Sequence, residues 1–174
     1  ARQSVSYYTR NGLPVGKQPE PERNSCGSPA AAANQDRFAA EKENAMLNVG
    51  IKGQAECLVT EKNTAATMGS GALQVYATPA MIALVEKAAW ESVQPYLEEG
   101  CGTVGTELRV KHLAATPVGL IVTARTELIA VEGRKLVFKV EVFDQTGKIG
   151  EGEHERFIVA NEKFFAKAQA KKNQ

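Results

Sequence analysis

The chain has 174 residues, with 21 basic and 20 acidic side chains and 43% apolar residues. This length suits one domain with a hydrophobic core of its own. The net charge of +1 gives no reason to expect nucleic acid or an anionic membrane surface as a partner, and no apolar run reaches the roughly 18 residues that a membrane-spanning helix needs.

The cysteines and histidines favour neither a disulfide framework nor a metal centre. Cys26, Cys57 and Cys101 are scattered, which is typical of a reducing compartment, so we expect a cytoplasmic protein. His112 and His154 are 42 positions apart, and neither belongs to a CxxC or HxxxH spacing. We therefore expect no metal site and no redox cofactor.

Residues 1–45 differ in composition from the rest of the chain. They contain four of the seven prolines, and their large apolar residues are few and isolated. Such a stretch cannot bury enough surface to offset the entropy lost on ordering, and it has no continuous apolar core like that of a secretory signal. We predict a disordered or adventitious leader over residues 1–45, a natural start at Met46, and one folded domain over residues 46–174.

The elements after Met46 are predicted in the order strand, helix and four strands. An extended stretch covers residues 50–60, and a loop of small residues covers 63–72. Thr78 is the expected helix N-cap and Pro79 the first helical residue, and the helix formers continue to Gln94. Short turns then join four antiparallel strands, at 103–113, 120–131, 135–144 and 148–160. A short polar helix follows at 162–171.

This order of elements indicates an α+β fold with the helix against one face of an antiparallel sheet. The polar residues of the helix before Gln94 are only Glu86, Lys87, Glu91 and Ser92. A helix with so little polar surface is expected to be covered on all sides. An antiparallel sheet of about five strands wrapped around one long helix is the hotdog fold; the alternatives are cystatin-like and other sheet folds with one helix.

Glu86 interrupts the apolar pattern of this helix. Its neighbours one turn away on either side are Ile82, Ala83, Ala89 and Trp90. A carboxylate in such a setting is expected to have a pKa raised by desolvation, as a general acid or base does. The alternatives are that Glu86 reaches solvent or pairs with an arginine of the sheet.

His112 ends the apolar face of its predicted strand. Counting in twos, it shares that face with Val104, Thr106, Leu108 and Val110. It is either a hydrogen-bonded core histidine or one half of an acid–base pair with a carboxylate on a facing element.

Three other residues are candidates for binding or catalysis. Thr78 either only caps the helix or lies beside unpaired amides that could stabilise an oxyanion. Gly105 interrupts a strand and marks either a bulge or a close approach of a ligand. Arg156 shares a strand face with His154 and either binds a carboxylate or phosphate group or forms a structural ion pair.

Five short motifs, taken together, carry a resemblance to a known family. They are VYATPAM at 75–81, LVE at 84–86, VGT at 104–106, VKHLAATPVG at 110–119 and GEGEHER at 150–156. They resemble the fluoroacetyl-CoA thioesterase-like subgroup of the hotdog thioesterases, over about residues 46–167. The resemblance implies an acyl-CoA thioester hydrolase that works as a homodimer, with its site at the subunit interface, and that binds the pantetheine arm of coenzyme A as part of the substrate, with no cofactor.

The resemblance also assigns roles to the candidate residues. It places the catalytic set on Thr78, Glu86 and His112, and substrate binding on Gly105 and Arg156. Glu86 and His112 are expected to transfer protons, while Thr78 is either the nucleophile or a group that positions water. The loop at 69–72 has no aromatic residue where the fluoroacetate-specific enzyme has phenylalanines, so the acyl group is left open.

Two alternatives remain at this point. A continuous helix would separate Thr78 and Glu86 by about 12 Å along its axis, so either Thr78 lies in a loop folded back over the helix or the two residues meet across the dimer. The function could instead be non-hydrolytic acyl-CoA binding, or dehydration or hydration by the same His/Glu pair.

Overall fold

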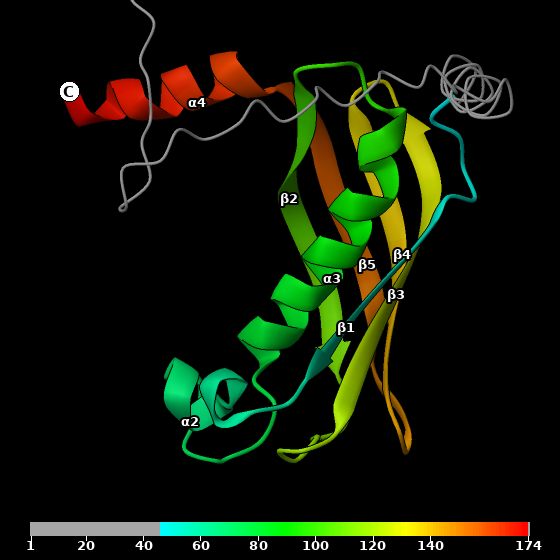
Figure 1. The fold of residues 1–174 in the computed structure, drawn as a ribbon. Helices are drawn as coiled ribbons and strands as arrows, with labels where there is room; N and C mark the ends of the chain where they lie inside the picture. The colour runs from blue at the N-terminus through cyan, green and yellow to red at the C-terminus, as the bar shows by residue number, and fades with distance from the viewer. Residues whose placement is uncertain (1–45, 174) are drawn as a thin grey trace, which may run out of the picture. The chain divides into compact units, whose positions relative to one another are not determined.

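The computed structural model describes residues 46–173, which form one curled sheet, a long helix packed against it, and shorter helices (Figure 1). The predicted leader, residues 1–45, lies outside the described residues and stays a prediction. In chain order the strands and helices are β1 (Lys52–Leu58), α2 (Ala65–Met68), α3 (Thr78–Val93), β2 (Cys101–His112), β3 (Ile121–Glu132), β4 (Lys135–Asp144), β5 (Gly147–Ala160) and α4 (Asn161–Ala170), with short 3-10 turns at Glu61–Asn63, Gln94–Tyr96 and Lys171–Asn173.

The five strands form one antiparallel sheet in the order β1-β3-β4-β5-β2. Tight turns join β3 to β4 and β4 to β5, so these strands are neighbours, while β1 and β2 are the two edges. Alternate residues of β4 are fully buried, because period-two alternation sends them all to the face under the helix; they are Leu136, Phe138, Val140 and Val142. The predicted strands are therefore present, with ends shifted by a few residues at most.

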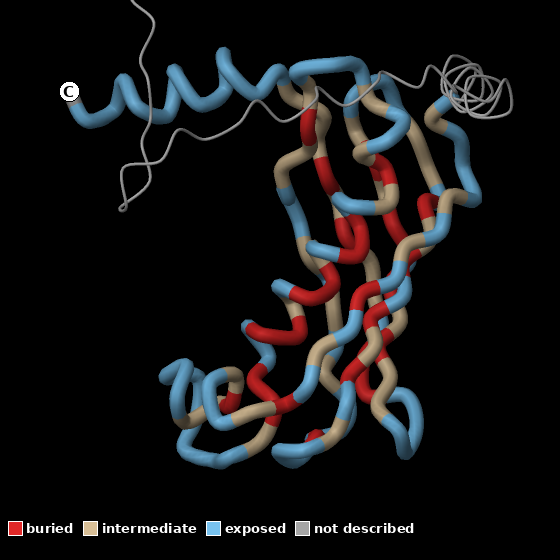
Figure 2. The backbone as a smooth tube through the Cα atoms, viewed as in Figure 1, coloured by how far each residue is buried: buried red, intermediate tan, exposed pale blue. Residues whose placement is uncertain are grey.

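Helix α3 buries one side against the sheet and leaves the other side open. Its buried residues recur every three or four positions, and Figure 2 shows them on the side facing the strands; they are Ala80, Met81, Leu84, Val85, Ala88, Ala89 and Val93. On the opposite side Trp90 is 40% exposed. The expectation that this helix is covered on all sides is therefore wrong for the single chain.

The start of α3 differs from the prediction by one residue. Ala77 is the N-cap, with an extended backbone, and Thr78 and Pro79 occupy the first two helical positions. The helix then runs without interruption to Val93. Thr78 is thus part of the helix, which contradicts the alternative that it lies in a loop folded back over it.

The small-residue segment before α3 is not a simple loop. It contains the one-turn helix α2, whose N-cap Thr64 is buried and accepts a hydrogen bond from the backbone N–H of Thr67 at 3.4 Å. Gly69 ends this turn with a left-handed backbone (φ 69°), which glycine adopts without steric cost. The segment is therefore ordered by its caps, which propensity alone does not reveal.

Helix α4 follows β5 and projects from the end of the sheet (Figure 1). All of its residues are exposed, and Phe165 is 64% exposed. Within residues 46–173, no helix is long and apolar enough to cross a membrane.

Candidate active site

Thr78 and His112 form a close polar pair at the start of α3. Thr78 lies in the first turn of the helix, and His112 is the last residue of β2. The Oγ1 atom of Thr78 is 2.8 Å from Nδ1 of His112. The sequence predicted both residues as catalytic, and the fold brings them together.

The surroundings of His112 favour the neutral form of its ring. Burial lowers the pKa of His112 below the ordinary value of a histidine, and a hydrogen bond with the backbone of Ala114 partly opposes this shift. The ring of Tyr76 packs edge-on against it, with centroids 6.5 Å apart. A neutral imidazole at pH 7 can accept a proton, which is what a general base must do.

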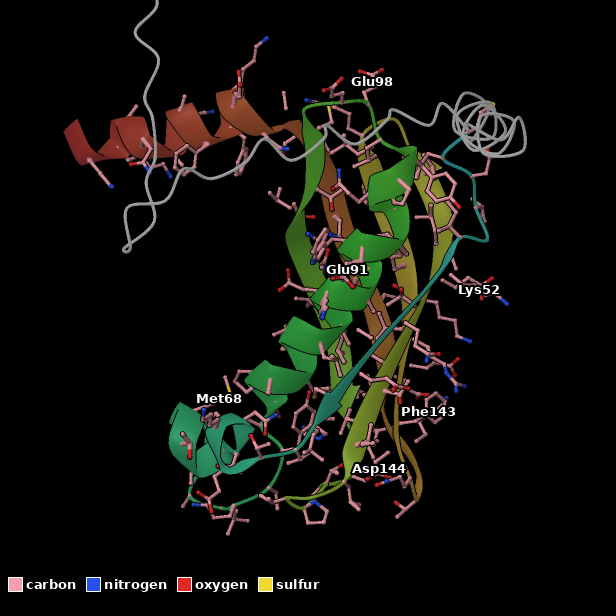
Figure 3. The ribbon with its side chains drawn as sticks, viewed as in Figure 1. Lys52, Met68, Glu91, Glu98, Phe143 and Asp144 are labelled. Atoms are coloured by element: carbon pink, nitrogen blue, oxygen red, sulfur yellow. The ribbon has the colours of Figure 1, made fainter. Side chains whose placement is uncertain are left out.

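A pocket of about 290 Å³ opens beside this pair. Helix α2 and the segment after it supply one wall, and the chain just after β2 supplies another; Figure 3 shows α2, marked by Met68, beside the N-terminal end of α3. Most of the lining side chains other than the Thr78–His112 pair are small or apolar: Ala65, Ser70, Val75, Tyr76, Leu113, Ala114 and Ala115. A substrate entering this pocket would meet the hydroxyl of Thr78.

Glu86 belongs to a different cluster, two turns further along α3. Its Oε2 accepts a hydrogen bond from Nη1 of Arg156 at 3.2 Å, and the Arg156 side chain is only 5% exposed. The structure therefore places Glu86 against an arginine of the sheet, one of the alternatives that the sequence left open. It does not bring Glu86 and His112 of one chain together as an acid–base pair.

Arg156 is fixed from several directions. Its Nε donates to Oγ1 of Thr103 at 2.8 Å, and its Nη2 donates to the carbonyl oxygen of Thr103 at 2.9 Å. Burial lowers the pKa of the Arg156 guanidinium, while the hydrogen bond and charge of Glu86 raise it; an arginine nonetheless stays protonated. The result is a partly buried ion pair between Arg156 of β5 and Glu86 of α3, with the arginine held by Thr103 of the edge strand β2.

Gly105 has no side chain, and this leaves room for the carboxylate of Glu86. The pairing of β2 with β5 shifts register between Gly105 and Glu107, so a bulge lies there, as the sequence suggested. A Cβ at Gly105 would lie 2.9 Å from Oε2 of Glu86 and 3.1 Å from Cε1 of His154. Any larger residue would have to displace the carboxylate or the ring.

His154 is part of the same cluster, and sequence reasoning did not select it. The side chain is fully buried on β5, with Nδ1 2.8 Å from the backbone oxygen of Glu107 and Nε2 3.1 Å from Nη1 of Arg156. The available signal was its position two residues before Arg156, since two polar residues then point into an apolar sheet face.

Residues 46–173 contain no group of three or more histidine, cysteine or acidic side chains that could hold a metal ion. The candidate residues thus form two clusters, a Thr–His pair and a Glu–Arg–His network, whose members lie on helix α3, the edge strand β2 and its neighbour β5.

Comparison with known proteins identifies the fold and the family. The model of the fluoroacetyl-CoA-specific thioesterase family, FlK, matches residues 59–162. The fluoroacetyl-CoA thioesterase of Streptantibioticus cattleyicolor is 47% identical over 98 residues, which is 56% of this chain and 70% of that protein.

Solved structures agree with this match. A structure of the thioesterase FlK superposes with a TM-score of 0.69 at 38% identity, covering 73% of this chain and 98% of that one. A Thermus thermophilus member of the thioesterase superfamily gives a TM-score of 0.68 at 29% identity, covering 73% and 94%. The predicted hotdog fold is confirmed, and the chain belongs to the fluoroacetyl-CoA-specific thioesterase family.

Proposed function

We propose that the protein hydrolyses acyl-CoA thioesters with Thr78 and His112 as its reacting pair. The predicted hydrolase class is confirmed by the family match and by the 47% identical relative. The roles of individual residues are our proposal, and the observation that carries it is the 2.8 Å contact between Oγ1 of Thr78 and Nδ1 of His112 beside a pocket.

The pair fits the chemistry of thioester cleavage. In the tautomer of His112 that carries its proton on Nε2, the hydroxyl of Thr78 donates to Nδ1. His112 can then take the proton as the Thr78 oxygen, or a water held by it, attacks the thioester carbonyl carbon. The carbon–sulfur bond then breaks, and the leaving sulfur takes the proton from His112 to give the coenzyme A thiol. Attack by water yields the free acid directly, whereas attack by Thr78 leaves an acyl ester on its oxygen, which a water deprotonated by His112 then hydrolyses, restoring the Thr78 hydroxyl. Backbone N–H groups in the first turn of α3 lack intrahelical partners and can stabilise the negative oxygen of the intermediate.

We assign Glu86 to the site of a second subunit. Because α3 is continuous, Glu86 and Thr78 of one chain lie about 12 Å apart along the axis, too far for one hydrogen-bond network. The Glu86 side chain is 38% exposed, and Gly105 beside it is exposed on the edge strand β2. A carboxylate that is partly exposed beside an edge strand, with Oε2 bonded to Arg156, is suited to a catalytic site that a second subunit completes.

The edge strand also suggests how two copies would meet. If two copies of β2 pair antiparallel about a two-fold axis at Arg109, the extra residue of the bulge at Thr106 sets Gly105 of one copy opposite His112 of the other. Glu86 packs against Gly105, so this register would bring it toward the Thr78–His112 pair of the other subunit. Arg156 would then orient Glu86 and would not bind the substrate itself, because its guanidinium already bonds to groups of its own chain.

The walls of the pocket bear on which acyl group is accepted. The pocket walls carry small side chains at Ala65, Ser70 and Ala115, so we do not assign fluoroacetyl selectivity to this chain. A homodimer, a cytoplasmic location and independence of any cofactor stay predictions.

The direct test is thiol release from a panel of short, branched and aromatic acyl-CoAs. We expect at least one ester to be hydrolysed, with the rate lost in Thr78→Ala and His112→Ala. Tight binding of every ester without turnover would instead favour a non-hydrolytic binding protein, and wild-type rates in both variants would remove the pair from the mechanism.

A further inference from the structure

His154 is the one fully buried histidine of the described chain, and it lies between the two halves of a charged network. It stands on β5 under α3, with the ring of Phe138 6.4 Å away. The groups that face it are Arg156 on its own strand, Glu86 on α3 and the backbone of Glu107 on β2. A polar ring at this depth needs a hydrogen-bond partner for each nitrogen.

The two contacts of the ring fix which nitrogen carries the proton. The backbone oxygen of Glu107 can only accept, so Nδ1, at 2.8 Å from it, must donate. The Nη1 group of Arg156 can only donate, so Nε2, at 3.1 Å from it, must accept. Only the neutral ring protonated at Nδ1 satisfies both contacts, because an imidazolium would set N–H against N–H.

The electrostatics of the network agree with a neutral ring. Burial and the charge of Arg156 lower the pKa of His154, and the Glu107 carbonyl and the charge of Glu86 oppose them without reversing the shift. The cluster then holds one positive and one negative charge. A second positive charge next to Arg156 would compete with it for Glu86.

The contact with His154 determines how Arg156 presents Glu86. The Nη1 group has two N–H bonds, and its two partners are Nε2 of His154 and Oε2 of Glu86. One N–H of Nη1 donates to the ring of His154, and Nε and Nη2 donate to Thr103. The second N–H of Nη1 is therefore directed at the carboxylate of Glu86. Oε2 is thereby held, and the other oxygen of Glu86 is left for chemistry.

We propose that His154 is a positioning residue for thioester hydrolysis, acting as a neutral hydrogen-bond acceptor that orients Arg156 and, through it, Glu86. This role rests on the proposed function of Glu86. His154 lies behind the arginine and is not itself placed against the substrate.

The first experiment needs no variant of His154. The chain has two histidines, so long-range ¹H–¹⁵N spectra of the wild-type protein show two imidazole rings, and His112→Ala assigns them. We expect His154 to be protonated at Nδ1 and unprotonated at Nε2 at pH 7. A ring protonated at Nε2, or a charged ring, would overturn the proposal. This result is independent of whether any acyl-CoA is hydrolysed.

The second experiment tests whether His154 acts through Glu86. His154→Leu removes the acceptor, and His154→Gln keeps an oxygen near the place of Nε2. We expect kcat to fall about tenfold to 100-fold in His154→Leu and to recover at least partly in His154→Gln. In a Glu86→Gln background, His154→Leu should cause little further loss, because residues that act as a unit are not additive.

Leu128→Ala is the matched control, since Leu128 is fully buried in β3 and outside the network. It should lower the melting temperature while leaving kcat and the His154 tautomer unchanged. An equal loss of kcat from His154→Leu in both backgrounds would show a purely structural residue. Absence of hydrolysis in the wild-type enzyme would instead contradict the proposed function and leave the tautomer result standing.

Discussion

The hydroxyl of Thr78 and Nδ1 of His112 are 2.8 Å apart although 34 residues separate them along the chain. The contact joins the first turn of α3 to the last residue of β2, and the chain between them runs up the helix and back down the strand. The pair therefore exists only when helix and sheet are packed together. Its chemistry is a property of the folded hotdog domain and not of a local motif.

Removal of either member of this pair should lower kcat by at least about 100-fold, the usual contribution of a positioned acid or base. The measurement is steady-state thiol release by Thr78→Ala and His112→Ala. Thr106→Ala is a matched control, because Thr106 is an exposed threonine of β2, the strand that ends at His112. Its hydroxyl donates a hydrogen bond to the backbone of Glu155. A wild-type kcat in either variant would contradict its role.

Mixing two inactive variants should restore activity if the site is shared between subunits. In a heterodimer of Thr78→Ala and Glu86→Gln chains, one of the two sites would contain Thr78 and Glu86 intact. Random assembly makes half of the dimers mixed, so co-expression should recover about a quarter of the wild-type rate. If Thr78 and Glu86 act within one chain, the mixture stays as inactive as its components.

Activity should fall on acidification as His112 becomes charged. The neutral ring is the competent base, and burial lowers the pKa of His112 below the ordinary histidine value of 6.5. The acidic limb of kcat/KM should therefore lie below pH 6.5, with full activity above it. A midpoint clearly above that value would mean that His112 is not the group that titrates.

Stability should also decrease as the pH is lowered, for a reason that involves both histidines. Each has a folded-state pKa below the ordinary histidine value of 6.5, so below that pH the unfolded chain binds protons that the folded chain does not. The stabilising contribution is complete above pH 6.5 and is lost as the pH falls through the folded-state values. Thermal melts between pH 7.5 and 5 should show this, and His154→Gln should weaken the dependence.

Gly105→Ala should impair catalysis more than its size suggests. The added methyl group would lie 2.9 Å from Oε2 of Glu86 and must push the carboxylate or His154 aside. We expect kcat to fall about tenfold or more and the stability to drop by about 1–3 kcal/mol. Gly71→Ala is the control, because its methyl group would meet Ala65 at an ordinary 3.4 Å; equal effects of both would contradict this explanation.

Much of the fold could be predicted because its signals are local and periodic. Alternation identified β4 to the residue, and Pro95 marked the end of α3 within one position. The one-turn helix α2 was missed because it depends on the capping hydroxyl of Thr64 rather than on propensity. The sequence could not predict the partners of Glu86, since strand pairing decides which side chain of the sheet lies beneath it.

His154 illustrates the same limit within the site. Its face was predictable by counting along β5, but its role depends on two contacts made across strands, to the backbone of Glu107 and to Arg156. Such contacts depend on the register of β2 against β5 and on the bulge at Gly105. The glycine indicated the bulge as one alternative, but the register cannot be inferred from the order of residues alone.

The pocket is built from two parts that differ in how freely their residues can be substituted during evolution. The groups that would perform the chemistry stand on α3 and β2, whereas one wall comes from α2 and the segment after it, through Ala65 and Ser70. Substitutions in that wall can alter the size of the acyl group accepted without moving Thr78 or His112. A lineage with this architecture can therefore diversify its substrates while inheriting its reaction intact.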